Sequence, residues 1–195
     1  MFRKNPITGA MALALLAIPA MAAAPQTGAP AWTVDHSRSS IGFSAVHSGQ
    51  AFSGTFGKWD AAILFDPDQL TRSSADVTID MNTPKTGDPS RDTTLPEGDW
   101  FNTFLFPTAS FKAETIRAGD APDSYIADGT LTIRDVSQPV SLPFTLAIDG
   151  DEARMQGTLT IDRGTFGVGQ GVWAGDGAVS LAVKVDVEVT ATRAN

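Results

Sequence analysis

The stretch Val179-Ser-Leu-Ala-Val-Lys-Val-Asp-Val-Glu-Val189 alternates apolar with mostly polar residues. A period of two is typical of a β-strand with one buried face and one solvated face. The same alternation runs through Val140–Ile148 and Ala75–Met81. Further strands are expected at Ser40–His47, Phe52–Trp59, Ala61–Phe65, Thr108–Thr115, Tyr125–Ile133 and Ala153–Ile161. The sequence therefore predicts about nine strands, with neighbours mostly antiparallel.

Turn residues such as Asp149-Gly-Asp151 separate these strands. A sheet of so many antiparallel strands must hide its edges, usually by closing into a barrel or folding into a sandwich. We predict an all-β fold, an extended antiparallel β-barrel of about eight strands, whose interior is either filled by side chains or holds one small ligand. An outer-membrane barrel is disfavoured, because Lys184, Asp186 and Glu188 occupy the outward face of the last strand.

The first 24 residues differ from the rest of the chain. Arg3 and Lys4 precede the apolar stretch Ala10–Ile18, and small residues follow at Ala20–Ala24. This order is typical of a cleaved secretory signal, and the apolar stretch is shorter than the roughly 20 residues of a membrane span. We predict a signal peptide at 1–24, a flexible leader at 25–30 and a barrel domain at 31–192, with the mature chain beginning at Ala23 or Pro25.

Length and composition restrict the function. The chain has 195 residues, of which 42% are hydrophobic and 18% charged, as suits one packed domain. A formal charge of −8 without a basic block argues against nucleic-acid binding. The lack of cysteine removes thiolate metal sites and thiol nucleophiles. No Gly-x-Ser-x-Gly elbow or phosphate-binding glycine loop occurs, so we predict that the protein is not an enzyme and needs no cofactor or metal.

Asn82–Pro107 is the one long stretch without alternation. A short helix is expected within Arg91–Asn102, starting near Asp92 or Thr93. Within seven positions the segment carries four aromatic residues, which are Trp100, Phe101, Phe104 and Phe106. We predict a short helical cap, whose aromatic side chains either plug one end of the barrel or form a gate over a pocket.

A family resemblance rests on a series of short motifs. They are Trp32-Thr-Val-Asp-His-Ser37, Ile41-Gly-Phe43, His47, Gly54-Thr-Phe56, Arg91-Asp92, Asp99-Trp-Phe-Asn102, Phe106-Pro107, Phe111, Gly129-Thr-Leu-Thr-Ile133, Pro139-Val140 and Asp162-Arg-Gly-Thr-Phe-Gly167. In order and spacing they resemble the YceI-like proteins of the bacterial periplasm, over roughly Trp32–Val189. The chain departs from that pattern at Trp100 in place of Phe, at Asn102 in place of Asp and at Asp135 where Gly is usual. The missing carboxylate at Asn102 weighs against a role that needs charge there.

The resemblance implies a lipocalin-like barrel that encloses a long polyisoprenoid chain, in some members part of an isoprenoid quinone, and carries it through the periplasm. Apolar burial is worth about 0.8 kcal/mol per CH₂, so a dry apolar tube would bind such a chain with few polar contacts. The candidate ligand-binding residues are Phe43, His47, Phe56, Phe65, Trp100, Phe101, Phe111, Leu131, Phe144 and Leu181. Each apolar member could equally be core filling. Transient contact with a membrane or membrane protein and a homodimer are further hypotheses for partners.

Two polar features stay open. His47 is in phase with Phe43 on the expected inward face, where it is a head-group donor, half of a metal site or a structural histidine at a strand end. Metal is the weakest of these, because only one other histidine, His36, is present. Arg91-Asp92 is interpreted as an ion pair that holds the loop, in preference to a substrate clamp.

Two other functional classes are alternatives to a lipid carrier. One is an interaction or stress protein, built on a barrel or a sandwich, without a lipid site. The other is a carboxylate-based hydrolase, for which 22 Asp and Glu residues offer many pairs but no distinctive one.

Overall fold

The computed structural model describes residues 28–194. Its strands are β1 (Ala31–Val34), β2 (Ser40–His47), β3 (Gln50–Phe56), β4 (Trp59–Leu64), β5 (Ser74–Asp80), β6 (Pro84–Lys85), β7 (Thr108–Ala118), β8 (Ser124–Ile133), β9 (Val136–Asp149), β10 (Glu152–Asp162) and β11 (Ala182–Arg193). One short α-helix, α1 (Pro89–Thr94), and four 3₁₀ turns, η1 (His36–Arg38), η2 (Leu70–Arg72), η3 (Arg163–Phe166) and η4 (Gly171–Trp173), complete the described elements.

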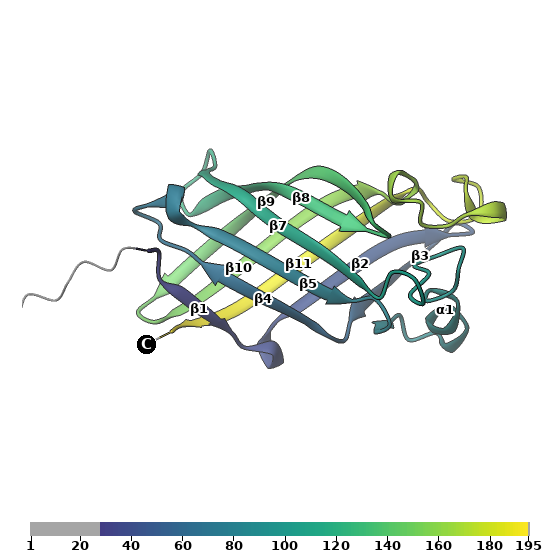
Figure 1. Cartoon of the computed structure of the whole chain (residues 1–195), viewed down its shortest axis with the longest axis horizontal. Helices are drawn as coiled ribbons and strands as arrows, with labels where there is room; N and C mark the ends of the chain where they lie inside the picture. The colour runs from purple at the N-terminus through teal and green to yellow at the C-terminus, as the bar shows by residue number, and fades with distance from the viewer. Residues whose placement is uncertain (1–27, 195) are drawn as a thin grey trace, which may run out of the picture.

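The strands close into an elongated antiparallel barrel (Figure 1). The order β1-β4-β5-β7-β8-β9-β10-β11 returns to β1, because Trp32 of β1 pairs with Arg193 of β11. The first half of β11 pairs instead with β2, which continues into β3 and β6. Closure pairs the strand edges that an open sheet would expose. The predicted all-β barrel of about eight strands is confirmed.

Most strand predictions are close to the structure, and the differences have local causes. The expected strand Phe52–Trp59 is two strands, because the chain turns at Gly57 and Lys58 between β3 and β4. The expected start of the last strand at Val179 is also wrong. Before Ala182 the backbone is bent, and the Leu181 N–H donates to the Asp176 carboxylate instead of a ladder partner.

A β-bulge interrupts β7. The register against β8 shifts between Ala113 and Thr115, so Ile116 and not Thr115 faces the interior. Gly129 of β8 lies opposite, and a Cβ atom there would collide with the backbone carbonyl of Lys112. The close approach of the two strands at the bulge therefore requires glycine at this position.

Helix α1 confirms the expected helical cap but begins earlier than predicted. Asp88 is its N-cap, and the carboxylate accepts hydrogen bonds from the N–H groups of Ser90 (2.9 Å) and Arg91 (3.2 Å). Pro89 occupies the first turn, where its missing N–H is of no consequence. The Asp-Pro pair is a stronger start signal than Asp92 or Thr93. In Figure 1, α1 lies at the end of the barrel away from the C-terminus.

The predicted signal peptide lies outside the described residues, as do residues 25–27 of the predicted leader. The last two residues of the predicted leader, Ala29 and Pro30, contact the barrel. Ala29 is buried, and the Phe65 N–H donates to the Pro30 carbonyl (3.0 Å). These two residues of the predicted leader are therefore held by the barrel. Among the described residues, no helix has the length and apolar character to cross a membrane.

Candidate functional site

The barrel is hollow. An apolar cavity of about 250 Å³ runs between its two buried clusters, from Trp32 and Phe144 in one half to Phe43 and Phe101 in the other. A single buried water needs only roughly 10–15 Å³ of such space. Every lining side chain is hydrophobic except Arg163. The interior is therefore a dry tube along the barrel axis.

Small side chains explain why the interior is not filled. Seven of the lining residues are alanines, which are Ala45, Ala61, Ala75, Ala109, Ala127, Ala153 and Ala191. They occupy inward positions where a leucine or phenylalanine would reach the barrel axis. An eight-stranded barrel is just wide enough for large side chains to fill, so alanine at these positions leaves room for a ligand.

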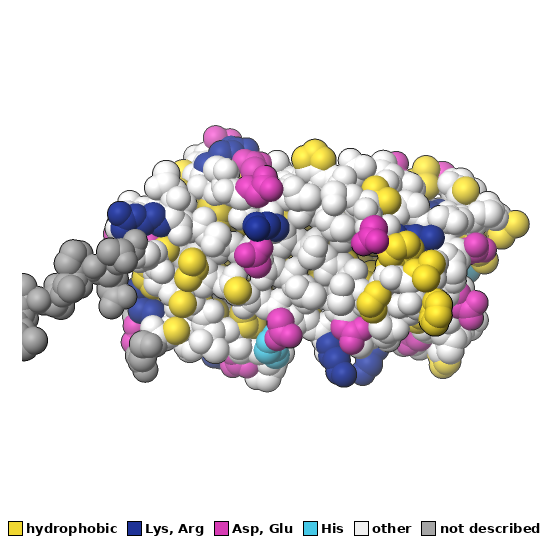
Figure 2. Space-filling view, viewed as in Figure 1, with side chains coloured by type: hydrophobic (Ala, Val, Ile, Leu, Met, Phe, Trp, Pro, Cys, Tyr) yellow, Lys and Arg dark blue, Asp and Glu magenta, His cyan; other side chains and the backbone are white. Residues whose placement is uncertain are grey.

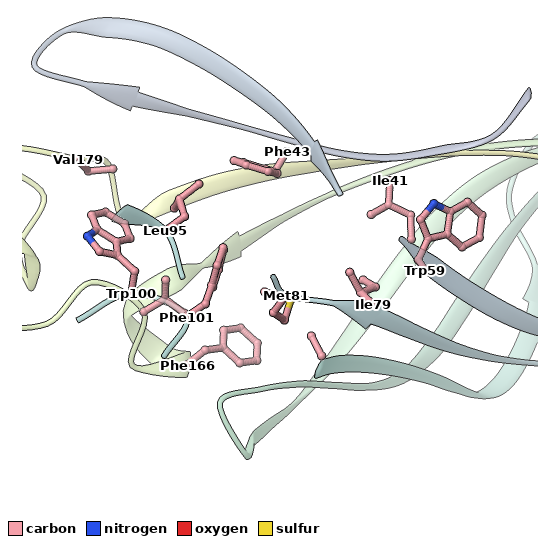
Figure 3. Close-up of a cluster of buried hydrophobic side chains, with 12 residues drawn as sticks. Ile41, Phe43, Trp59, Ile79, Met81, Leu95, Trp100, Phe101, Phe166 and Val179 are labelled. Atoms are coloured by element: carbon pink, nitrogen blue, oxygen red, sulfur yellow. The ribbon is translucent and has the colours of Figure 1, made fainter. Parts of the chain in front are cut away.

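Eight of the ten candidate binding residues line the cavity. They are Phe43, Phe56, Phe65, Trp100, Phe101, Phe111, Leu131 and Phe144. The ring centroids of Phe43 and Phe56 are 5.2 Å apart, and those of Phe56 and Phe101 are 6.0 Å apart. These three rings form an aromatic wall near the cap. Figure 3 shows Phe43 and Ile41 of β2, Ile79 of β5 and the cap residues Trp100 and Phe101 around one interior.

His47 is not part of this lining, and its expected inward direction is wrong. The alternation of β2 ends at Ala45, and both Val46 and His47 are exposed. At this end β2 still pairs with the segment before β11, through the bridge between His47 and Val179, but its side chains are exposed. The His47 ring instead lies edge-on to Trp173, with centroids 6.4 Å apart. This position matches the structural interpretation of a histidine at a strand end.

Leu181 also lies outside the cavity lining. It is in the bend before β11, whose inward side chains begin at Val183. Its Cδ2 atom instead approaches Gly164 of η3. Leu181 was expected to face inward because the last strand was predicted to run unbroken from Val179. The bend at Leu181 interrupts the alternation, so its side chain does not face the cavity.

The capped end is closed by Leu95, Trp100 and Phe101, all of them buried. Two sets of hydrogen bonds hold this segment. Arg134, in the tight turn between β8 and β9, donates from Nη1 to the carbonyls of Gly98 (2.8 Å) and Trp100. The Asp99 carbonyl accepts from two N–H groups of the loop after η3, those of Gly169 (2.8 Å) and Gln170 (2.7 Å). The aromatic cap is thus attached to two other loops.

Arg134 and Asp135 both have left-handed backbone conformations, with φ of 53° and 57°. A two-residue hairpin turn requires positive φ at both central positions, which explains why Gly is usual at the position of Asp135. The turn directs the Arg134 side chain toward the cap. Partial burial lowers the pKa of Arg134 below its ordinary value, but the guanidinium remains charged at neutral pH.

Arg163 holds the second loop. It is 3% exposed, and its five N–H groups donate only to backbone carbonyls. The acceptors are the carbonyls of Val168, Gly169, Trp173, Gly175, Val179 and Ser180, at 2.7 to 3.4 Å. Burial lowers the pKa of this guanidinium, and no salt bridge within residues 28–194 includes it. Arg163 belongs to the motif Asp162–Gly167, which by itself gives no sign of this role.

Trp100 carries an unpartnered donor. Its Nε1 atom is buried and has no hydrogen-bond partner among the described residues. The indole lies 5.6 Å from Trp173 and 5.3 Å from the Arg163 guanidinium, measured from ring centroids. In Figure 3 the nitrogen points away from Met81 and Ile79, toward the capped end. Buried indole N–H groups are usually paired, so this donor is left for an acceptor at the capped end.

Arg91 and Asp92 do not pair with each other as expected. Arg91 forms an ion pair with Asp88 (3.4 Å) and lies 4.2 Å above the Phe52 ring. The Asp92 carboxylate accepts from the N–H and hydroxyl of Thr86, both at 2.7 Å, and these bonds lower its pKa. Arg91 contacts β3 of the barrel through Phe52, whereas Asp92 holds α1 to the residue that follows β6.

Arg134→Ala is expected to loosen the cap without unfolding the barrel. The substitution removes two hydrogen bonds from a charged donor, each worth about 1.5–3 kcal/mol. Amide hydrogen exchange in residues 97–103 should therefore accelerate by tenfold or more, because the free energy of one such hydrogen bond corresponds to about a tenfold change in the opening equilibrium. Arg117→Ala is the matched control, because Arg117 pairs with Asp128 on the barrel exterior. Equal exchange in both variants would contradict the assignment of Arg134 to the cap.

A closed barrel that encloses a continuous apolar cavity defines a class of proteins that bind hydrophobic small molecules. Within residues 28–194 no group of three or more His, Cys, Asp or Glu side chains could hold a metal ion. A family model described as a YceI-like domain matches residues 32–191. The chain belongs to this family.

Relatives and solved structures agree with the assignment. A UPF0312 protein of Pseudomonas aeruginosa (strain LESB58) is 29% identical over 154 residues, which cover 75% of this chain and 79% of that protein. BcnA of Burkholderia cenocepacia is 30% identical, with a TM-score of 0.78 over 82% of this chain and 99% of BcnA. A polyisoprenoid binding domain from Saccharophagus degradans, implicated in plant cell wall breakdown, is 16% identical, with a TM-score of 0.67 over 85% and 99% of the two chains. At that identity the last match supports the fold alone.

Proposed function

We propose that this protein is a periplasmic carrier that encloses one isoprenoid lipid, a polyprenyl chain or an isoprenoid quinone, inside its barrel. The observation that carries the proposal is the dry cavity along the barrel axis, with no free charged group on its wall. Each methylene moved from water into such a tube contributes about 0.8 kcal/mol, so a long chain binds through its length alone. The predicted export signal supports the location. The apolar tube supports the ligand class, in a fold that a polyisoprenoid binding domain shares.

The polar end of the ligand belongs at the cap. Arg163 has no N–H group left for a phosphate, because backbone carbonyls accept from all five. The free donor is the neutral indole N–H of Trp100. A single neutral donor fits an uncharged acceptor, such as a quinone carbonyl or an alcohol oxygen, better than a pyrophosphate. The head-group role considered for His47 therefore passes to Trp100.

Binding without chemistry is the second part of the proposal. The lining holds only hydrophobic side chains and the saturated Arg163, so no general base or nucleophile faces the tube. Loading and release require contact with a membrane or a membrane protein, because the free lipid is almost insoluble in water.

Organic extraction of the purified native protein, followed by mass spectrometry, tests the proposal. The expected result is a prenyl lipid with an uncharged head group, close to one per chain. Trp100→Phe keeps an aromatic ring and removes the donor, so it should retain prenyl chains while discriminating less among their head groups. Loss of one neutral hydrogen bond predicts a change of roughly 3- to 12-fold in head-group preference. An extract without prenyl lipid, from protein that also fails to take up added polyprenol, would refute the carrier function.

A further inference from the structure

The exposed large hydrophobic side chains gather at the capped end of the barrel. Among the described residues they are Val46, Leu64, Phe104, Leu105 and Val172. Phe104 and Leu105 lie on the cap, Val172 lies in η4, and Val46 lies near the end of β2, and Figure 1 shows these elements at the same end of the barrel. Figure 2 shows hydrophobic side chains gathered on the surface at this end. Phe104 is 93% exposed and Val172 is 86% exposed. A cluster of this kind is unusual on a soluble surface and marks a contact site.

The backbone of the cap presents Phe104 outward. The Asn102 carbonyl accepts from the N–H groups of Leu105 (3.0 Å) and Phe106 (2.9 Å), and the Thr103 N–H donates to the Pro96 carbonyl (3.0 Å). The segment is therefore a hydrogen-bonded turn, with Phe104 at its exposed position. Its exposure follows from this local structure and not from a frayed loop.

The same short segment closes the tube and carries the exposed side chains. Trp100 and Phe101 point into the interior, whereas Phe104 and Leu105 face solvent. Val172 lies in η4, on the loop that is attached to the cap through the Asp99 carbonyl. Both loops that cover this end of the cavity thus present apolar side chains outward. A surface that engages these side chains also touches the segments that must move for a lipid to pass.

We propose that Phe104, Leu105 and Val172 dock the capped end onto a lipid bilayer, where the lipid passes between the membrane and the tube. The inference rests on the proposed function. The side chains protrude from two separate loops, and a bilayer interface accepts protruding apolar groups at any spacing. The formal charge of −8 opposes binding to anionic lipids, so the surface suited to this protein is zwitterionic.

Vesicle binding and lipid transfer test the proposal. The double variant Phe104→Ser/Val172→Ser is compared with wild type and with Leu64→Ser, a control near Ala31 at the other end of the barrel. Co-sedimentation with phosphatidylcholine vesicles measures docking. Transfer of solanesol, a long polyprenol, from loaded protein to the vesicles measures release. Full burial of one phenylalanine side chain changes the partition coefficient between water and bilayer by at least about tenfold. The double variant should therefore show vesicle binding and solanesol transfer that are each lower by tenfold or more. Its solanesol content before transfer should equal that of wild type.

Several results would overturn the docking surface. They are equal vesicle binding by wild type and the double variant, an equal loss in Leu64→Ser, and no binding by wild type. A wild-type dimer that the double variant converts to monomer, without vesicle binding by either, would assign the patch to a second copy of the chain. Wild type that binds vesicles through the patch but takes up no solanesol would contradict the carrier function and leave the docking surface supported.

Discussion

Arg163→Met is expected to lower the free energy of unfolding by at least about 4 kcal/mol. The methionine fills part of the space but donates to none of the six carbonyls that the guanidinium now satisfies. Each buried acceptor left without a partner costs about 1–3 kcal/mol, and water can reach only some of them. The loop after η3 should lose its conformation first. Urea denaturation followed by tryptophan fluorescence measures the effect, because Trp100 and Trp173 lie beside this loop.

Arg163→Lys separates geometry from charge. Lysine keeps the positive charge but offers three donors from one atom, which cannot reach carbonyls spread around a planar fork. It should recover less than half of the lost stability. Arg154→Met on β10 is the control, since the Arg154 side chain is 70% exposed and pairs with Glu152 at the surface. Full stability in Arg163→Lys would show that the charge, and not the set of hydrogen bonds, is what matters.

Phe144→Asp should abolish ligand binding and cost about 4 kcal/mol of stability at neutral pH. The ring stacks on Tyr125 with centroids 5.4 Å apart and lies 6.5 Å from Phe65, in a region with no polar partner on the cavity wall. Desolvation raises the pKa of the introduced carboxyl in the folded state above about 3.9, the value of an unfolded aspartate. The folded state then holds the proton more tightly, so the deficit grows as the pH rises above that value.

Thermal unfolding at two pH values and uptake of added polyprenol measure both effects of Phe144→Asp. Thr145→Asp is the matched control, because Thr145 is the next residue of β9 and faces solvent. It should change stability by less than about 0.5 kcal/mol and leave uptake unchanged. Phe111→Ala is a milder test of the same wall and should leave the fold intact while altering ligand content. Unchanged uptake in both Phe144→Asp and Phe111→Ala would show that the lipid does not occupy this half of the barrel.

The strands were predictable because alternation is a local property. In β2, β8 and β10 the apolar period of two gave boundaries within one residue of the structure. The errors arose where local rules compete with contacts from elsewhere. The bulge in β7 places Ile116 on the inner face, where unbroken alternation from Ala109 would place Thr115. The bend at Leu181 follows from a hydrogen bond to Asp176, which no alternation pattern reveals.

The binding residues were partly predictable for the same reason. Inward aromatic residues such as Phe43 and Phe144 follow from the strand phase. His47 shares that phase in the sequence, but its side chain is exposed at the end of β2, beside Trp173. The role of Arg163 was hidden, because all its partners are backbone carbonyls, which every sequence contains.

Alternation and turn chemistry were enough to specify a closed antiparallel barrel with an apolar interior, since each depends on neighbours along one strand. Whether that interior is filled or hollow depends on the sum of side-chain volumes that meet at the barrel axis. Alanines such as Ala75 and Ala153 come from different strands, and only strand pairing and register bring them together around the cavity. The cap, its attachment through Arg134 and Arg163, and the free indole N–H of Trp100 likewise depend on contacts between distant segments. Packing in three dimensions therefore turned a predictable barrel into a hollow tube that is capped at one end.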